Sequence, residues 1–169
     1  PGSPVIDGSV LSRYRALKLL DAHLKYMSRA ERETLLQSIE RSCGVPVPGE
    51  KGALTSTFTE SDVRQLHSRG FGVGAHSVNH TVLAHCTDEE ALRECAESKA
   101  VLEQIIGSEV DGFAYPNGLP GKDFSANHLN ILRKVGYRYA VTTSPGYAHG
   151  ASDFMALPRF TPWGPSLNQ

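Results

Sequence analysis

The feature that most constrains the fold of this chain is a unit of helix, glycine and strand that occurs three times after residue 58. The three predicted helices begin at Thr59, Thr87 and Ser125, and each ends at a glycine, Gly70, Gly107 or Gly136. The strands that follow them are FGVGAHS (71–77), VDGFAYP (110–116) and YRYAVTT (137–143). Because strands that alternate with helices usually pair in parallel, the repeat predicts an α/β protein.

Local signals support the helices of this repeat. Asp62 follows Thr59 by three residues and Glu90 follows Thr87 by three, which is the spacing of a capping box. Apolar residues recur at helical spacing through the second helix, so Cys95 is predicted to lie in the core. Three histidines on predicted helices are expected to be solvated: His23, His67 and His128.

A helical arm precedes the repeat. Apolar residues recur every three or four positions from Leu11 to Arg41, Ser28 is placed to cap the second of two helices, and Gly44 ends it. The turn-rich segment VPVPGEKG (45–52) marks a boundary. We therefore expect a helical arm and linker over residues 1–52 and an α/β part over residues 53–169.

Polar residues follow each predicted strand of the repeat. His76 and His80 end or follow the first strand, Tyr115 to Gly118 the second, and Thr142 to Gly146 the third. In parallel α/β proteins the functional residues gather beyond the carboxyl ends of the strands. The three loops are therefore expected to open on one face and to form a site there.

The histidine pair, His76 and His80, is the strongest chemical signal. Gly72 and Gly74 argue against a helix, so the H-x-x-x-H spacing falls on a strand end and the loop after it. Two imidazoles there can converge on one metal ion, although lone histidines are more often surface residues. Catalytic zinc takes three protein ligands, so a third, most naturally a carboxylate, is still needed. For the nearby His85 and Cys86 a structural role is expected.

Composition excludes several classes of partner. The formal net charge is -1 and no lysine- or arginine-rich run is present, so neither nucleic acid nor a membrane surface is an expected partner. No apolar run approaches the ~20 residues that a membrane-spanning helix needs. Three cysteines without a C-x-x-C pair support neither a disulfide framework nor a cysteine zinc site.

Residues 54–161 resemble the polysaccharide deacetylases, the NodB-homology domain of carbohydrate esterase family four. HSVNH (76–80) matches the second motif of that family, H-[ST]-x-x-H, and FAYPNG (113–118) matches the third motif in the form of one branch. The segment that ends near Arg159 resembles the closing strands of that branch. The resemblance implies an incomplete or distorted (β/α) barrel with an N-terminal helical arm, which removes N-acetyl groups from aminosugar residues of a polysaccharide.

The resemblance also implies a role for each motif residue. A divalent metal, most simply zinc, would be held by His76 and His80 with one aspartate, and water on it would attack the amide carbonyl. A second aspartate would act as general base. The backbone N–H of Asn117 would bind the oxyanion together with the metal, and Ser77 would orient the histidine loop. Tyr115, Pro116 and Trp163 would contact the sugar, with Trp163 equally suited to a core or tail position.

The chain also departs from the family pattern. The first motif, T-F-D-D-G, which carries both aspartates, is missing, and Asp7 in VIDGS (5–9) is a weak candidate for it. We expect that the chain begins downstream of this motif, that it is inactive alone, and that an exposed sheet edge favours self-association. Arg159 is the candidate to orient the base, since Ala114 occupies the usual place of an arginine. His149 is a candidate general acid, although a solvated loop histidine is favoured.

Two other functions stay open at this stage. A non-catalytic carbohydrate-binding relative would keep the groove without the chemistry, and a deacetylase of small amides would keep the chemistry without a polymer groove. The expected partner in the leading hypothesis is an N-acetylated glycan. The family analogy suggests an extracellular, periplasmic or cell-envelope location.

Overall fold

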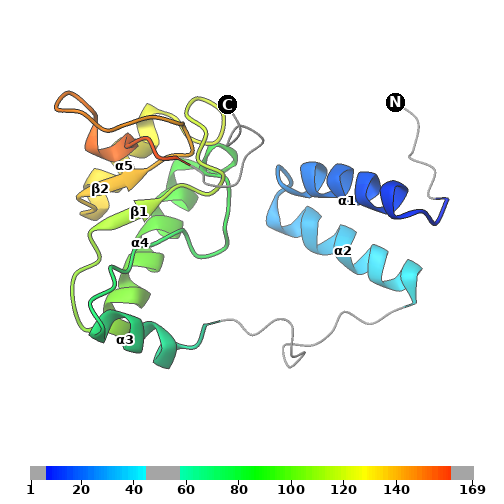
Figure 1. Ribbon diagram of the computed structural model, residues 1–169, viewed down its shortest axis with the longest axis horizontal. Helices are drawn as coiled ribbons and strands as arrows, with labels where there is room; N and C mark the ends of the chain where they lie inside the picture. Colours follow the sequence, from blue (N-terminus) through cyan, green and yellow to red (C-terminus); the bar gives the residue numbers. More distant parts are fainter. Residues whose placement is uncertain (1–6, 45–57, 161–169) are drawn as a thin grey trace. The chain divides into compact units, whose positions relative to one another are not determined.

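The computed structural model describes residues 7–44 and 58–160 (Figure 1). The chain divides into two compact units, residues 1–56 and residues 57–169. Within the described residues, no helix is long and apolar enough to cross a membrane.

The first unit contains the two helices that the sequence predicts, α1 (Val10–Leu24) and α2 (Arg29–Cys43). Ser28 caps α2 and forms a reciprocal capping box with Glu31, and Gly44 ends the helix in the left-handed region at φ 62°. None of the described side chains of α1 is buried. Apolar residues of α1 such as Val10 and Leu17 are therefore largely exposed.

The second unit contains the repeat. Its elements in chain order are α3 (Glu60–Ser68), η1 (Leu83–His85), α4 (Asp88–Ile106), β1 (Gly112–Ala114), α5 (Ala126–Val135), β2 (Tyr139–Val141) and η2 (Phe154–Ala156). The predicted capping boxes of Thr59 with Asp62 and of Thr87 with Glu90 are both present. Gly107 and Gly136 end α4 and α5 with positive φ, as predicted.

The strands of the second unit are parallel, and their order in the sheet follows their order in the chain. β1 pairs with β2 so that Phe113 lies opposite Ala140. Isolated bridges add Ala75 beside Phe113 and Leu157 beside Val141, both parallel. The result is a row of four parallel segments, which confirms the parallel pairing that the repeat predicts.

The predicted strand at 71–77 is the main difference from expectation, because only Ala75 pairs. Its N–H donates to the Gly112 carbonyl at 2.9 Å, and its carbonyl accepts from the Ala114 N–H at 2.8 Å. Both of these bonds reach β1, and the residues just before Ala75 include Gly72 and Gly74. Glycine loses more conformational freedom than other residues on ordering, so a glycine-rich segment paired on one side forms little regular strand.

The core lies between the sheet and α4 and α5. Phe113 of β1 contacts Tyr137 at 5.2 Å between ring centroids. Cys95 of α4 and Leu132 of α5 are fully buried in the same cluster, so the prediction for Cys95 is confirmed. The expectation for His128 is wrong: this residue of α5 is only 6% exposed. It is buried because its ring turns back to the start of the helix, where Nδ1 accepts from the Ser125 N–H at 2.9 Å.

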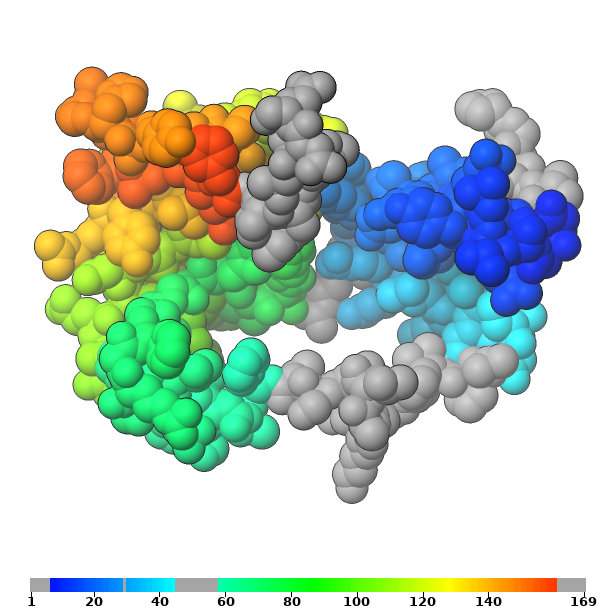
Figure 2. All heavy atoms as spheres, in the orientation of Figure 1, coloured from blue at the N-terminus to red at the C-terminus, as the bar shows by residue number. Residues whose placement is uncertain are grey.

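The segment after β2 returns to the sheet. Leu157 donates its N–H to the Ala140 carbonyl and accepts from the Thr142 N–H, each at 2.8 Å. The space-filling view shows this segment, orange to red, on the surface of the second unit (Figure 2). The carboxyl end of β2 is thereby held beside the last described residues of the unit.

Candidate functional site

His76 lies one residue beyond the bridge at Ala75, at the carboxyl end of its segment. Its Nδ1 lies 2.7 Å from the Ala114 carbonyl oxygen at the end of β1. Because a carbonyl can only accept, Nδ1 carries the proton in this contact, and the lone pair of the ring is on Nε2. A histidine whose second nitrogen donates to a backbone carbonyl has the arrangement typical of metal-ligating histidines.

His80 lies beside His76, as the sequence predicts. The two ring centroids are 4.7 Å apart and the ring planes meet at 78°, edge to face. The loop between them contains two residues in the left-handed region, Ser77 at φ 61° and His80 at φ 53°. Such angles are uncommon outside glycine, so the loop has an unusual backbone path that places two imidazoles together.

Ser77 was expected to orient this loop. Its Oγ is buried, and in the described part of the chain it has no hydrogen-bond partner. Glu94 of α4 bonds the loop: its Oε2 accepts from the N–H groups of Val78 and Asn79, each at 2.9 Å. Glu94 is not among the site residues that the sequence predicts. A signal was present, because Glu94 falls on the stripe of α4 that carries Ala91, Cys95 and Ser98, all of them buried.

Asn117 lies at the end of the second predicted loop. It has φ 61°, a conformation that asparagine tolerates better than most residues. The next residue, Gly118, accepts from the Thr143 N–H at 2.9 Å, which joins this loop to the one that follows β2. Since the Ala114 carbonyl contacts His76, the three predicted loops do meet at the carboxyl ends of the strands.

Tyr115 and Pro116 do not fit the sugar-binding role that the sequence suggested. Tyr115 is 1% exposed, stacks on Phe124 at 3.7 Å between centroids, and donates its hydroxyl hydrogen to the Met155 carbonyl at 2.8 Å. Burial raises the pKa of this phenol above its usual range. Pro116 is also fully buried. Both residues support the loop from the core, because the surfaces that a sugar would contact are buried there.

The other predicted residues lie in several places. His149 is exposed; its backbone N–H donates to Ser152 Oγ and its Nδ1 accepts from the Ala151 N–H. Arg159 is exposed and donates its backbone N–H to the Ser144 carbonyl at 3.0 Å. The described hydrogen bonds of both residues therefore stay within the segment after β2. Trp163 lies outside the described residues.

Asp7 belongs to the first unit. Its Oδ1 accepts from the Ser9 N–H at 2.9 Å, just before the first turn of α1. Hydrogen bonds from Ser9 and Ser12 lower the pKa of this carboxyl to about 2. Ser9 is the N-cap of α1, so the Asp7 carboxylate bonds the capping residue from two positions before it.

The histidine pair fits two ligands of a divalent metal. Nε2 of His76 is the nitrogen left to coordinate, and its ring orientation is fixed by the Ala114 carbonyl. Over residues 7–44 and 58–160 no group of three or more His, Cys, Asp or Glu side chains is arranged to hold a metal. The described residues thus supply part of a ligand set.

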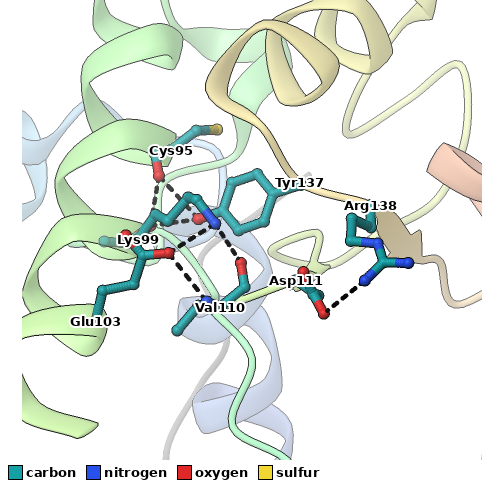
Figure 3. Close-up of polar contacts among 8 residues, drawn as sticks. Cys95, Lys99, Glu103, Val110, Asp111, Tyr137 and Arg138 are labelled. Carbon is teal, nitrogen blue, oxygen red and sulfur yellow. Dashed lines mark hydrogen bonds and ion pairs between the residues drawn. The ribbon is translucent and has the colours of Figure 1, made fainter. Parts of the chain in front are cut away.

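A hollow of about 620 Å³ lies at the opposite, amino end of the strands and is distinct from this site. Its walls include Lys99, Glu103, Asp111 and Arg138. Four of the charges there form two ion pairs, Lys99 with Glu103 at 2.9 Å and Arg138 with Asp111 at 3.5 Å. Figure 3 shows these contacts together with the bonds from Lys99 and Glu103 to the backbone of Val110, which join the end of α4 to the start of β1. We interpret this region as structural.

The fold and the site define an α/β protein of parallel helix–strand repeats with a histidine pair at the carboxyl end of the sheet. The family model for polysaccharide deacetylase matches residues 23–140, which is more than half of the chain. The chain therefore belongs to the polysaccharide deacetylase family. No curated protein matches it significantly.

Solved structures agree with this assignment. The Streptococcus pyogenes deacetylase PplD, solved in complex with acetate, is similar with a TM-score of 0.58 and 25% identity over 65% of this chain and 46% of that one. A polysaccharide deacetylase from Bacillus cereus gives a TM-score of 0.55 and 24% identity over 65% of this chain and 34% of that one. IcaB from Ammonifex degensii gives 0.52 and 19% identity over 74% and 60%. The last two likenesses concern the fold, and the chain spans less than half the length of the first two proteins.

Proposed function

We propose that this chain forms part of a metal-dependent hydrolase that removes N-acetyl groups from aminosugar residues of a polysaccharide. The observation that carries the proposal is the His76–His80 pair, with ring centroids 4.7 Å apart at the carboxyl end of the sheet, in a member of the deacetylase family. The similar S. pyogenes deacetylase was solved with acetate, which is the acid that such a reaction releases. Zinc is the metal that the paired imidazoles favour.

The fold that we propose for the whole site is an incomplete or distorted (β/α) barrel, of the branch whose third motif is F-A-Y-P-x-G. Four parallel segments that follow one another in chain order, at Ala75, β1, β2 and Leu157, support this proposal. In such a barrel the loops beyond the carboxyl ends surround the substrate. The histidine loop and the Asn117 loop are two of these.

Each residue of this chain would then have a definite task. His76 and His80 would hold the metal, with the Ala114 carbonyl fixing the ring of His76. When bound, the metal would supply Lewis-acid activation of the amide carbonyl and of the attacking water. The backbone N–H of Asn117 would donate to the oxyanion, and the left-handed turn at this residue would aim that N–H. Arg159 remains our candidate to orient the general base, and His149 our candidate for the acid.

A carbohydrate-binding relative is the second candidate function. The observation that favours it is that the carboxylate of Asp7, the one candidate for the first motif, already bonds the start of α1. Such a protein would bind N-acetylated glycans through the same loops without hydrolysing them. A deacetylase of small amides would instead act on short substrates and ignore polymers.

The metal site is tested by zinc titration of the full chain. We expect the chain to bind zinc, and both His76→Ala and His80→Ala to lose this binding, because each removes one imidazole ligand. His23→Ala is the matched control, since His23 is an exposed histidine of α1 in the other unit, and it should bind zinc as the wild type does. Unchanged zinc binding in both site variants would refute the pair as ligands.

The reaction is tested with an N-acetylated chito-oligosaccharide and a zinc-loaded longer protein in which this chain follows a segment carrying the T-F-D-D-G motif, because the chain alone is expected to be inactive. Release of acetate, lost in His80→Ala, would support the deacetylase. Binding of the oligosaccharide without acetate release, and without any need for zinc, would support the carbohydrate-binding relative. Acetate release from N-acetylglucosamine alone but not from the oligomer would support the small-amide enzyme.

A further inference from the structure

Glu94 carries a carboxylate that is buried in the second unit. It lies on α4 between Ala91 and Cys95, both 0% exposed, and is itself only 9% exposed. A carboxylate removed from water is costly unless hydrogen bonds replace the lost hydration. A glutamate that served only to cover the core would be replaced at lower cost by an apolar residue.

All three described hydrogen bonds of this carboxylate come from the loop between the two histidines. Oε2 accepts from the backbone N–H groups of Val78 and Asn79, each at 2.9 Å. Oε1 accepts from the Asn79 side-chain amide at 2.6 Å. Hydrogen bonds to a charged acceptor are roughly twice as strong as neutral ones, so Glu94 clamps this loop at three points.

The loop needs such a clamp because its backbone is strained at both ends. Ser77 at φ 61° and His80 at φ 53° flank the clamped residues. Left-handed angles at non-glycine residues persist only where the surrounding structure holds them. Ser77 Oγ has no partner among the described residues, whereas Glu94 bonds the loop directly to α4.

The clamp acts between the two candidate ligands. His76 is already held at Nδ1 by the Ala114 carbonyl, on the sheet side of the loop. His80 directly follows Asn79, so the direction in which its ring leaves the backbone depends on where Asn79 is held. Fixing Val78 and Asn79 therefore sets the position of the second imidazole relative to the first.

We propose that Glu94 is the positioning residue that holds His76 and His80 together as a pair, an inference that rests on the proposed metal site. The carboxylate does not contact the metal or the substrate in this assignment. It acts through the backbone of residues 78 and 79, and its effect is to present two imidazoles already spaced for one ion. A ligand pair arranged before binding has less conformational freedom to lose when it binds.

The test compares Glu94→Ala with Glu97→Ala in the full chain. Glu97 is an exposed residue of the same helix, so its replacement controls for the loss of a charge on α4. Without metal, Glu94→Ala should speed amide hydrogen exchange at Val78 and Asn79 and weaken the nuclear Overhauser contacts between the two imidazole rings. With metal, its affinity for zinc should fall by about 10–100-fold, as is typical for groups that orient ligands. Glu97→Ala should behave as the wild type in all three measurements.

Two further variants make the result independent of folding defects. Glu94→Gln keeps one oxygen that can accept from both N–H groups, so it should recover most of the exchange protection and zinc affinity. Asn79→Ala removes the side-chain arm of the clamp and keeps both backbone bonds, so it should weaken zinc binding by a smaller factor while the chain stays folded. If Glu94→Ala does not fold, the proposal is tested with Asn79→Ala. An Asn79→Ala chain with the ring contacts and the zinc affinity of the wild type would overturn the proposal.

The outcome separates this inference from the proposed function. If the wild type binds no zinc, the proposed metal site is refuted. The amide exchange rates and the ring contacts are measured without metal, so they still test whether Glu94 holds the loop. A folded Glu94→Ala chain with unchanged ring contacts would overturn the clamp even if exchange at Val78 and Asn79 were faster. Equal loss of zinc affinity in Glu94→Ala and Glu97→Ala would overturn it as well, because a charge effect would then explain both.

Discussion

Gly118 and Gly121 lie three residues apart in the loop after β1 and share a left-handed backbone, with φ of 79° and 75°. Their surroundings differ. A Cβ atom at Gly118 would lie 3.1 Å from the Tyr115 carbonyl oxygen and 3.2 Å from the Thr143 backbone nitrogen, whereas nothing lies within 4 Å of a Cβ at Gly121. Substitutions at these two glycines therefore separate the free-energy cost of an unfavourable φ from the free-energy cost of steric crowding.

We expect both Gly118→Ala and Gly121→Ala to destabilise the chain by about 1–2 kcal/mol through φ alone. Gly118→Ala should lose about 1–3 kcal/mol more, because backbone atoms cannot move aside as a flexible side chain can. Equilibrium unfolding in urea measures both losses. Equal losses in the two variants would mean that the contact between the Asn117 loop and the loop after β2 is not tight.

The sequence predicts the positions and roles of some single residues better than those of others. The H-x-x-x-H spacing and its strand-end position were enough to predict that His76 and His80 lie together, because both are local properties of the chain. An aromatic residue in the third motif suggests sugar binding for Tyr115, yet its ring stacks on Phe124, nine residues later. Glu94 was missed because its three hydrogen bonds reach a loop at least 15 residues away, which helical periodicity does not encode.

At the scale of elements, α5 has a histidine, His128, at the N3 position where a capping box usually has glutamate or glutamine. Nδ1 of His128 accepts from the Ser125 N–H at 2.9 Å, which requires the neutral ring. Burial lowers the pKa of His128, while the Leu83 carbonyl and the Asp88 carboxylate act in the opposite direction. The folded chain therefore binds a proton at this site less readily than the unfolded chain does.

This start of α5 makes the stability of the second unit depend on pH. Since the pKa of His128 is lowered on folding, its contribution is complete above the unfolded value of about 6.5 and is lost as pH falls from there towards the folded value. We expect His128→Gln, which can cap without titrating, to lose less stability than the wild type between pH 7.5 and pH 5. Urea unfolding at the two pH values measures the difference.

His23→Gln serves as the control for that experiment, because His23 is an exposed residue of α1. It should show the same pH dependence as the wild type. A His128→Gln chain that lost as much stability on acidification as the wild type would show that the cap does not titrate in this range.

Elements were predicted with unequal success for a physical reason. Helices carry their start and stop signals in their own sequence, so Thr59, Thr87 and Gly107 gave boundaries that the structure confirms. A strand depends on partners that are distant in the chain. The segment 71–77 has a strand-like sequence, but only Ala75 pairs. Its described bonds reach β1 on one side, and the neighbouring residues of the segment have no strand partner there.

At the scale of the whole molecule, the core that the described residues form lies in one unit. Their buried hydrophobic side chains run from Ala75 to Met155, within residues 57–169. α1 has no buried side chain among its described residues. Since burial of apolar surface is the main favourable contribution to folding, the free energy of unfolding should arise mostly in the second unit.

The chain shortened to residues 57–169 should therefore fold by itself. We expect it to retain a cooperative thermal transition within a few degrees of that of the full chain, because every residue of the core cluster is kept. Zinc affinity should also be unchanged, since His76, His80 and Glu94 all lie in the retained unit, and circular dichroism with zinc titration measures both quantities. A large fall in the midpoint of unfolding would mean that the helices of the first unit cover surface that the second unit needs. A fall in zinc affinity alone, with the transition preserved, would mean instead that residues 1–56 supply a group to the metal site.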